Sequence, residues 1–159
     1  MKERTEKVNL KTDSDGFLSQ ECPSCLKIFK VVFEEGSEAG KVLSFCPYCR
    51  HEGQNCWWTQ AQAKFFGDFA LNTFVGPKLD ELEQRFKKGS GGFLDISVTS
   101  NRNRSPVAPA EPADEMSQLE FTCCNETIKH DESSNALYCI LCGLESEGDS
   151  KVNESALGS

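Results

Sequence analysis

Two cysteine pairs of identical spacing constrain this chain more than any other feature. Cys22-Pro-Ser-Cys25 and Cys46-Pro-Tyr-Cys49 each place two thiols three positions apart, and 20 residues separate the pairs. This spacing is typical of a zinc knuckle, a tight turn whose two sulfurs point at one ion. Two knuckles supply the four soft thiolates that tetrahedral zinc accepts. The sequence therefore predicts a first metal site made of these four cysteines.

The size of the chain and its polar start favour metal over disulfides for its nine cysteines. Only 38% of the 159 residues are hydrophobic, and small domains with little core usually need metals or disulfides. The first 16 residues are polar and lack the apolar core of a secretory signal. No stretch approaches the roughly 20 apolar residues of a membrane span. We therefore predict a protein of the reducing cytoplasm, with no membrane contact, where structural disulfides are rare.

The residues between the two knuckles predict a β-hairpin. Residues 27–33 and 41–45 are rich in β-branched and aromatic side chains, and the EEGSEAG segment between them is a turn signal. A hairpin whose open ends are joined through one zinc ion is a zinc β-ribbon. Residues 17–53 accordingly resemble the zinc-ribbon superfamily. The resemblance implies a fold and a structural metal, but no particular function, because ribbons serve many proteins.

Two redox alternatives use the same thiols. The CPYC segment also resembles the redox motif of glutaredoxins, which needs a preceding strand and a following helix. Here the loop-like RHEGQN follows, and a matching CPSC pair lies upstream. Four thiolates can also hold iron, as in rubredoxin-type electron-transfer proteins. An iron redox protein is the weakest of the functional hypotheses.

A second cysteine cluster follows near the C-terminus. Cys139 and Cys142 form a knuckle, and the glycine that follows suits a turn that needs a positive φ. Their partners come from Cys123, Cys124 and His130. Either both adjacent cysteines bind, or one of them joins the histidine, and the spacing does not choose between these. Four of these five residues are predicted to hold a second zinc ion.

An apolar stripe predicts helices after the first knuckle pair. Thr59 and Gln62 match a capping box, and apolar residues then recur at steps of three and four. Gly76-Pro77 interrupts the pattern, and a second helix is expected over 77–88. The stripe holds more apolar area than a small ribbon can cover, which favours a protein partner or self-association. The predicted partner-binding residues are Phe65, Phe69, Phe74, Leu79, Leu82 and Phe86.

Composition divides the chain into five predicted segments. The overall class is a small metal-stabilised α+β protein, with an N-terminal zinc ribbon, appended helices, a flexible linker and a second ribbon-like module. An alternating segment at 93–99 predicts a strand, which either adds to the ribbon sheet of the first module or pairs at an edge with another protein. The segments are a flexible arm at 1–15, the ribbon with helices and strand at 16–99, a disordered linker at 100–117, the second module at 118–145 and an acidic disordered tail at 146–159.

Charge and absent motifs narrow the function. The net charge is −8, and residues 89–159 hold 12 acidic against 4 basic side chains, which disfavours binding to nucleic acid. No P-loop, HExxH, GxGxxG or GxSxG motif is present, and four thiolates leave zinc no open position for catalysis. We therefore predict a non-catalytic adaptor or accessory subunit. The alternative is a nucleic-acid-binding regulator that uses Lys27, Lys30, Lys41 and Arg50, with Trp57, Trp58 or Phe45 stacking on bases.

Overall fold

The computed structural model describes residues 8–33, 43–53, 57–89, 105–113, 115–134 and 136–146. The described residues form two units, and the chain is divided differently from the predicted segments. The helical unit is Met1–Lys11 with Trp58–Ala110, and the sheet unit is Thr12–Trp57 with Glu111–Ser159. The predicted strand at 93–99 and the tail beyond residue 146 lie outside the described residues. The elements are β1 (Phe17–Glu21), β2 (Ile28–Val32), α1 (Gln60–Ala70), η1 (Leu71–Val75), α2 (Gly76–Gly89), β3 (Ser117–Phe121), β4 (Glu126–His130), β5 (Leu137–Tyr138) and β6 (Glu145–Ser146).

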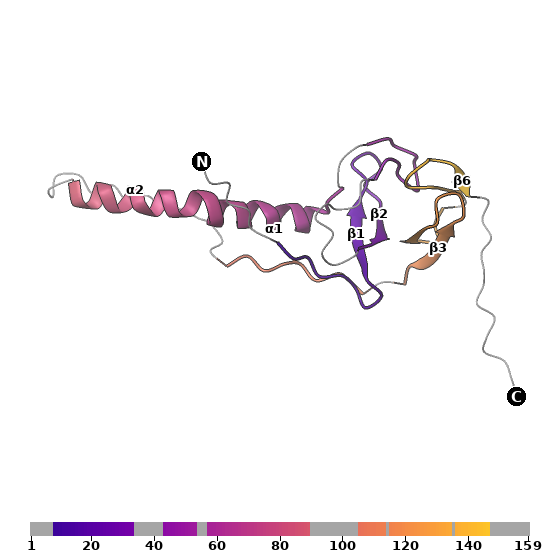
Figure 1. Cartoon of the computed structure of the whole chain (residues 1–159), viewed down its shortest axis with the longest axis horizontal. Coiled ribbons are helices and arrows are strands. Elements are labelled where there is room, and N and C mark those ends of the chain that lie inside the picture. Colours follow the sequence, from indigo (N-terminus) through magenta and orange to yellow (C-terminus); the bar gives the residue numbers. More distant parts are fainter. Residues whose placement is uncertain are drawn as a thin grey trace, which may run out of the picture. The chain divides into compact units, whose positions relative to one another are not determined.

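The sheet unit contains a four-stranded antiparallel sheet with the strand order β1-β2-β4-β3, and β5 and β6 form a separate two-stranded sheet. Figure 1 labels β1, β2, β3 and β6. Strands β1 and β2 form one hairpin, and β3 and β4 form another. The hairpins join where Lys30 pairs with Lys129 and Val31 pairs with Ile128. Each inner strand thereby satisfies the free backbone groups of the other. The two cysteine clusters therefore lie in one sheet unit, where the sequence had predicted two modules separated by a linker.

The pairing of β2 also differs from the predicted hairpin of 27–33 with 41–45. Both edges of β2 are occupied, one by β1 and the other by β4. The described part of the second segment pairs elsewhere, since Phe45 forms a β-bridge with Glu52. The knuckle at Cys22 and Cys25 is itself the turn that joins β1 to β2. A short turn brings β1 alongside β2 at little cost in chain entropy, and this explains the choice of partner.

The hydrophobic core covers one face of the four-stranded sheet. Because side chains alternate along a strand, Phe29 and Val31 of β2 share this face with Ile128 of β4. They pack against the segments that carry the cysteines. The buried cluster comprises Cys22, Phe29, Val31, Leu43, Cys46, Trp57, Phe121, Ile128, Leu137, Cys139 and Ile140. Three of the cysteines, Cys22, Cys46 and Cys139, are therefore part of the core.

The opposite face of the sheet carries a buried network of charges. Lys30 and Lys129 are both buried, and their ammonium groups reach the same Asp13 carboxylate at 3.3 and 2.8 Å. Lys129 also pairs with Asp15 at 2.7 Å, and Glu111 lies 3.8 Å from the Lys30 ammonium. Residues from the predicted arm and the predicted linker therefore contact the sheet, because the two lysines need partners when they are buried.

The helical unit confirms the predicted capping box. The Thr59 side chain accepts a hydrogen bond from the Gln62 backbone, and the Gln62 side chain accepts one from the Thr59 backbone. The predicted interruption at Pro77 differs from what is found, because α1, η1 and α2 follow one another without a gap. A π-helical turn precedes the proline, and Gly76 donates to the Leu71 carbonyl five residues back. This wider turn accommodates the ring that would clash in a regular α-helix.

Within the described residues, no helix is both long and apolar enough to cross a membrane.

Candidate metal centres

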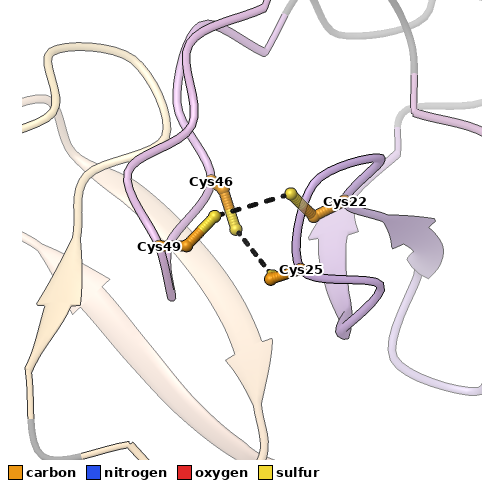
Figure 2. Close-up of side chains that lie close together, drawn as sticks. All are labelled: Cys22, Cys25, Cys46 and Cys49. Carbon is orange, nitrogen blue, oxygen red and sulfur yellow. Dashed lines mark hydrogen bonds between the residues drawn. The ribbon is translucent and has the colours of Figure 1, made fainter.

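The first cluster brings together Cys22, Cys25, Cys46 and Cys49, whose sulfur atoms lie within 4.8 Å of one another. Figure 2 shows the two knuckles facing each other across the site. The sulfurs of Cys22 and Cys49 are 3.7 Å apart, and those of Cys25 and Cys46 are 3.8 Å apart. Metal–sulfur bonds of about 2.3 Å in a tetrahedron place the sulfurs about 3.8 Å apart. The four sulfurs are therefore spaced to hold a tetrahedral metal ion.

Three CxxC turns share one backbone pattern that explains this placement. In each turn, the N–H of the first cysteine donates to the carbonyl of the residue five positions later. The N–H of the residue after the second cysteine donates back to the carbonyl of the first. That residue has a positive φ in every case, 59° at Leu26, 59° at Arg50 and 68° at Gly143. Only the glycine could have been recognised from the sequence, because leucine and arginine rarely adopt this conformation.

Burial and hydrogen bonds give the thiols of the first site different pKa values. The backbone N–H groups of Ser24 and Tyr48 lie 3.4 Å from the sulfurs of Cys22 and Cys46. Burial raises the pKa of Cys46. Burial also opposes the ionisation of Cys49, but hydrogen bonds from the His51 backbone and the neighbouring thiols lower its pKa. Complete ionisation of four adjacent thiols needs a cation, which is the role that a bound metal would have.

The second cluster consists of Cys123, Cys124, Cys139 and Cys142, again with all sulfurs within 4.8 Å. The sulfurs of Cys142 and Cys123 are 3.5 Å apart. His130 lies outside this group, and its Nδ1 is 2.7 Å from the Asp131 carbonyl oxygen. The adjacent cysteines occupy the turn between β3 and β4, whereas the histidine ends β4 at its opposite end. The structure therefore brings both adjacent cysteines together with Cys139 and Cys142, and His130 lies outside this cluster.

The second site differs from the first in exposure. Cys139 is buried, Cys124 is half-buried, and the other two cysteines are exposed, whereas the first site has two buried cysteines. A hydrogen bond from the Leu144 backbone lowers the pKa of Cys142 to about 7. Hydrogen bonding with Cys142 raises the pKa of Cys124 to about 11. The first site is thus the better shielded of the two.

The predicted partner-binding side chains are exposed toward the C-terminal end of the helix. Phe65 is buried, with 8% of its surface exposed, and Phe69 and Leu79 are half-buried. Phe74, Leu82 and Phe86 are 45%, 46% and 45% exposed. Leu71 and Val75 of η1 are also exposed, in addition to the predicted partner-binding residues. An exposed apolar surface therefore extends from η1 through α2.

The basic residues proposed for phosphate contacts are mostly engaged elsewhere. Lys30 is only 1% exposed and belongs to the buried charge network. Lys27 donates to the hydroxyls of Ser133 and Ser134 at 3.1 and 3.2 Å. Trp57, a proposed stacking residue, is buried. Lys41 lies outside the described residues. Arg50, the remaining proposed phosphate contact, is exposed.

The fold and site define a small α+β protein in which two four-cysteine clusters could each hold a metal ion. No family model, curated protein or solved structure matches this chain. The interpretation of the sites consequently depends on their geometry and on the chemistry of thiolates.

Proposed function

We propose that the protein is a non-catalytic adaptor or accessory subunit, with two structural zinc ions that hold a double zinc ribbon. The two halves of the sheet unit, one for each cysteine cluster, have the same arrangement. In each half a long hairpin carries one cysteine pair at its turn, and a shorter turn carries the other pair. Four thiolates complete the coordination of zinc and leave no position for a substrate or an activated water. In this proposal the metal stabilises the fold, and the thiols require a reducing compartment such as the cytoplasm.

The exposed apolar surface of η1 and α2 is the observation that supports a role in binding a protein partner. Phe74, Leu82 and Phe86 each leave close to half of their surface in contact with solvent. Large exposed apolar patches on small proteins mark sites of protein association, and aromatic residues are enriched among the residues that dominate binding energy. A partner with an apolar groove or helix would cover this surface.

Metal analysis of the purified full-length chain tests the zinc assignment. We expect two zinc ions per chain by native mass spectrometry, and a colourless protein. A chain that carries iron with the charge-transfer colour of an iron–thiolate centre would move the assignment to the redox hypothesis.

Purification of the tagged chain from its native host tests the adaptor role. We expect a stoichiometric protein partner that survives nuclease treatment and is lost in the Phe74→Ser/Phe86→Ser variant. Gln84→Ser is the matched control, because it also changes an exposed side chain of α2. If the partner remained bound to a folded, zinc-loaded double variant, this surface would not be the binding site. Loss of all partners on nuclease treatment would favour the nucleic-acid alternative.

A further inference from the structure

We infer that the two metal centres load cooperatively, and that Tyr48 is a positioning residue that links them. This inference rests on the proposed binding of metal at both sites, and it adds an energetic connection between them. The sites share one buried cluster, to which Cys22, Cys46 and Cys139 all belong. A metal ion that orders one cysteine turn would therefore order core residues that the other site also needs.

Direct backbone contacts join a knuckle of the first site to the knuckle of the second. The N–H groups of Ser44 and Phe45 both donate to the carbonyl of Ile140, at 2.9 and 3.0 Å. The N–H of Tyr138 donates to the carbonyl of Pro47 at 2.9 Å. Ile140 and Pro47 each lie inside a CxxC turn, between its two cysteines. The bonds thus connect the metal-binding turns themselves.

The phenol of Tyr48 adds a second connection from within the first site. Its backbone N–H lies 3.4 Å from the Cys46 sulfur, so the position of Tyr48 depends on the cysteine turn that would bind the metal. Its hydroxyl donates to the carbonyl of Ile28 in β2 at 3.0 Å and accepts from the N–H of Asp131 at 3.1 Å. Asp131 directly follows β4, which belongs to the second hairpin. One side chain therefore bonds to both hairpins.

A close packing contact completes the connection. Gly143 has a φ of 68°, and a Cβ added there would lie 3.0 Å from the ring of Phe45. The residue after the second-site knuckle is thus in contact with the residue before a first-site knuckle. Ordering of either turn limits the conformations of the other, and a ligand that orders a shared element raises the affinity of the second site.

Metal titration of three variants tests the inference. The affinities of the full chain for Zn²⁺ are measured by competition with a chromophoric chelator, and coordination is followed by Co²⁺ absorption. We expect Cys139→Ser/Cys142→Ser to weaken binding at the first site by about 5-fold or more, within the usual range of coupling between sites. Cys22→Ser/Cys25→Ser should weaken the second site by the same factor, because coupling between two binding equilibria is reciprocal.

Tyr48→Phe tests the linking residue with all eight ligands retained. This change keeps the ring and removes the two hydroxyl bonds, each of which contributes a factor of about 5 to an equilibrium constant. We expect two metals still to bind, but with the coupling reduced several-fold. Tyr138→Phe is the matched control, because among the described residues no hydrogen bond of its hydroxyl is found. It should titrate like the unmodified chain.

Three results would contradict the inference in distinguishable ways. Site affinities that are unchanged by loss of the other site would show two independent centres and refute cooperativity. Coupling that survives Tyr48→Phe unchanged would refute the role of this tyrosine. A chain that binds no metal at either cluster would refute the proposed structural zinc and the cooperativity together.

Discussion

Asp13 is the residue whose replacement we expect to reveal most about how the two hairpins are held together. Its carboxylate bonds to both Lys30 and Lys129, which are cross-strand neighbours on β2 and β4. These strands form the junction between the hairpins, so the carboxylate bridges the junction on the face opposite the core. Asp13→Asn keeps the size of the side chain and removes its charge.

The structure gives the magnitude of the expected effect. Burial alone would raise the pKa of Asp13, but hydrogen bonds from Lys129, from two backbone N–H groups and from Lys30 lower it to about 2, against an ordinary value of 3.8. This difference corresponds to about 2.5 kcal/mol of stabilisation of the ionised form. Only 12% of the side chain is exposed, so screening by solvent is modest. We expect Asp13→Asn to lower the free energy of unfolding by about 2–3 kcal/mol.

Thermal and denaturant unfolding at pH 7 with excess zinc measure this loss. A change of this size should lower the melting temperature by about 5–10 °C in a chain of this length. Asp15→Asn is the matched control, because the Asp15 carboxylate also pairs with Lys129 but is 53% exposed. It should cost less than about 1 kcal/mol, as surface pairs do.

The pH dependence of the free energy of unfolding provides a second test, because the direction of the change is defined. Because the pKa of Asp13 is lower in the folded chain, its contribution is complete above about pH 4. The contribution is lost as the pH falls from about 4 through 2. The difference in the free energy of unfolding between the unmodified chain and Asp13→Asn should therefore be constant from pH 5 to 8. If Asp13→Asn were as stable as Asp15→Asn at pH 7, the carboxylate would not hold the hairpins together and the reasoning would be refuted.

Three further predictions concern the helix and the metal sites. Thr59→Ala removes the N-cap and should destabilise α1 by about 1 kcal/mol, measured by helix melting in circular dichroism, whereas no loss would show that the cap is dispensable. Gly143→Ala places a Cβ at 3.0 Å from the Phe45 ring at a φ of 68° and should cost at least about 1–2 kcal/mol, measured by urea unfolding of the zinc-loaded chain. Acidification from pH 7 to 5 should release zinc from the second site, because protons compete with zinc for thiols such as Cys124, whose pKa is about 11. Competition with a chelator at each pH measures this release. An affinity that does not change with pH would show that the thiols are not ligands.

The sequence by itself determined the parts of this protein that depend on local chemistry. The CxxC spacing identified the four cysteines that the structure brings together in the first cluster, because two thiols three positions apart in a tight turn can reach one ion. The capping box fixed where α1 begins, since its two hydrogen bonds join residues only three positions apart. Gly143 marked a turn with positive φ for the same local reason.

Tertiary structure alone decided which distant segments meet. The spacing could not choose between Cys123, Cys124 and His130, because the answer depends on which end of β4 lies beside the knuckle of the second site. Leu26 and Arg50 adopt positive φ values that their side chains disfavour, so the closure of the turn imposes them.

The joining of β2 to β4 is the largest feature that the sequence did not reveal. The sequence offered Lys30 as a phosphate contact in the nucleic-acid alternative, yet Lys30 and Lys129 are both buried beside Asp13. Their burial is stable only because two separate segments supply carboxylates at one place, Asp13 with Asp15 and Glu111. The pairing of β2 with β4 joins residues far apart in the sequence, and it leaves no hydrophobic periodicity within either segment. The sequence therefore predicted two modules, whereas the structure joins both hairpins in one four-stranded sheet.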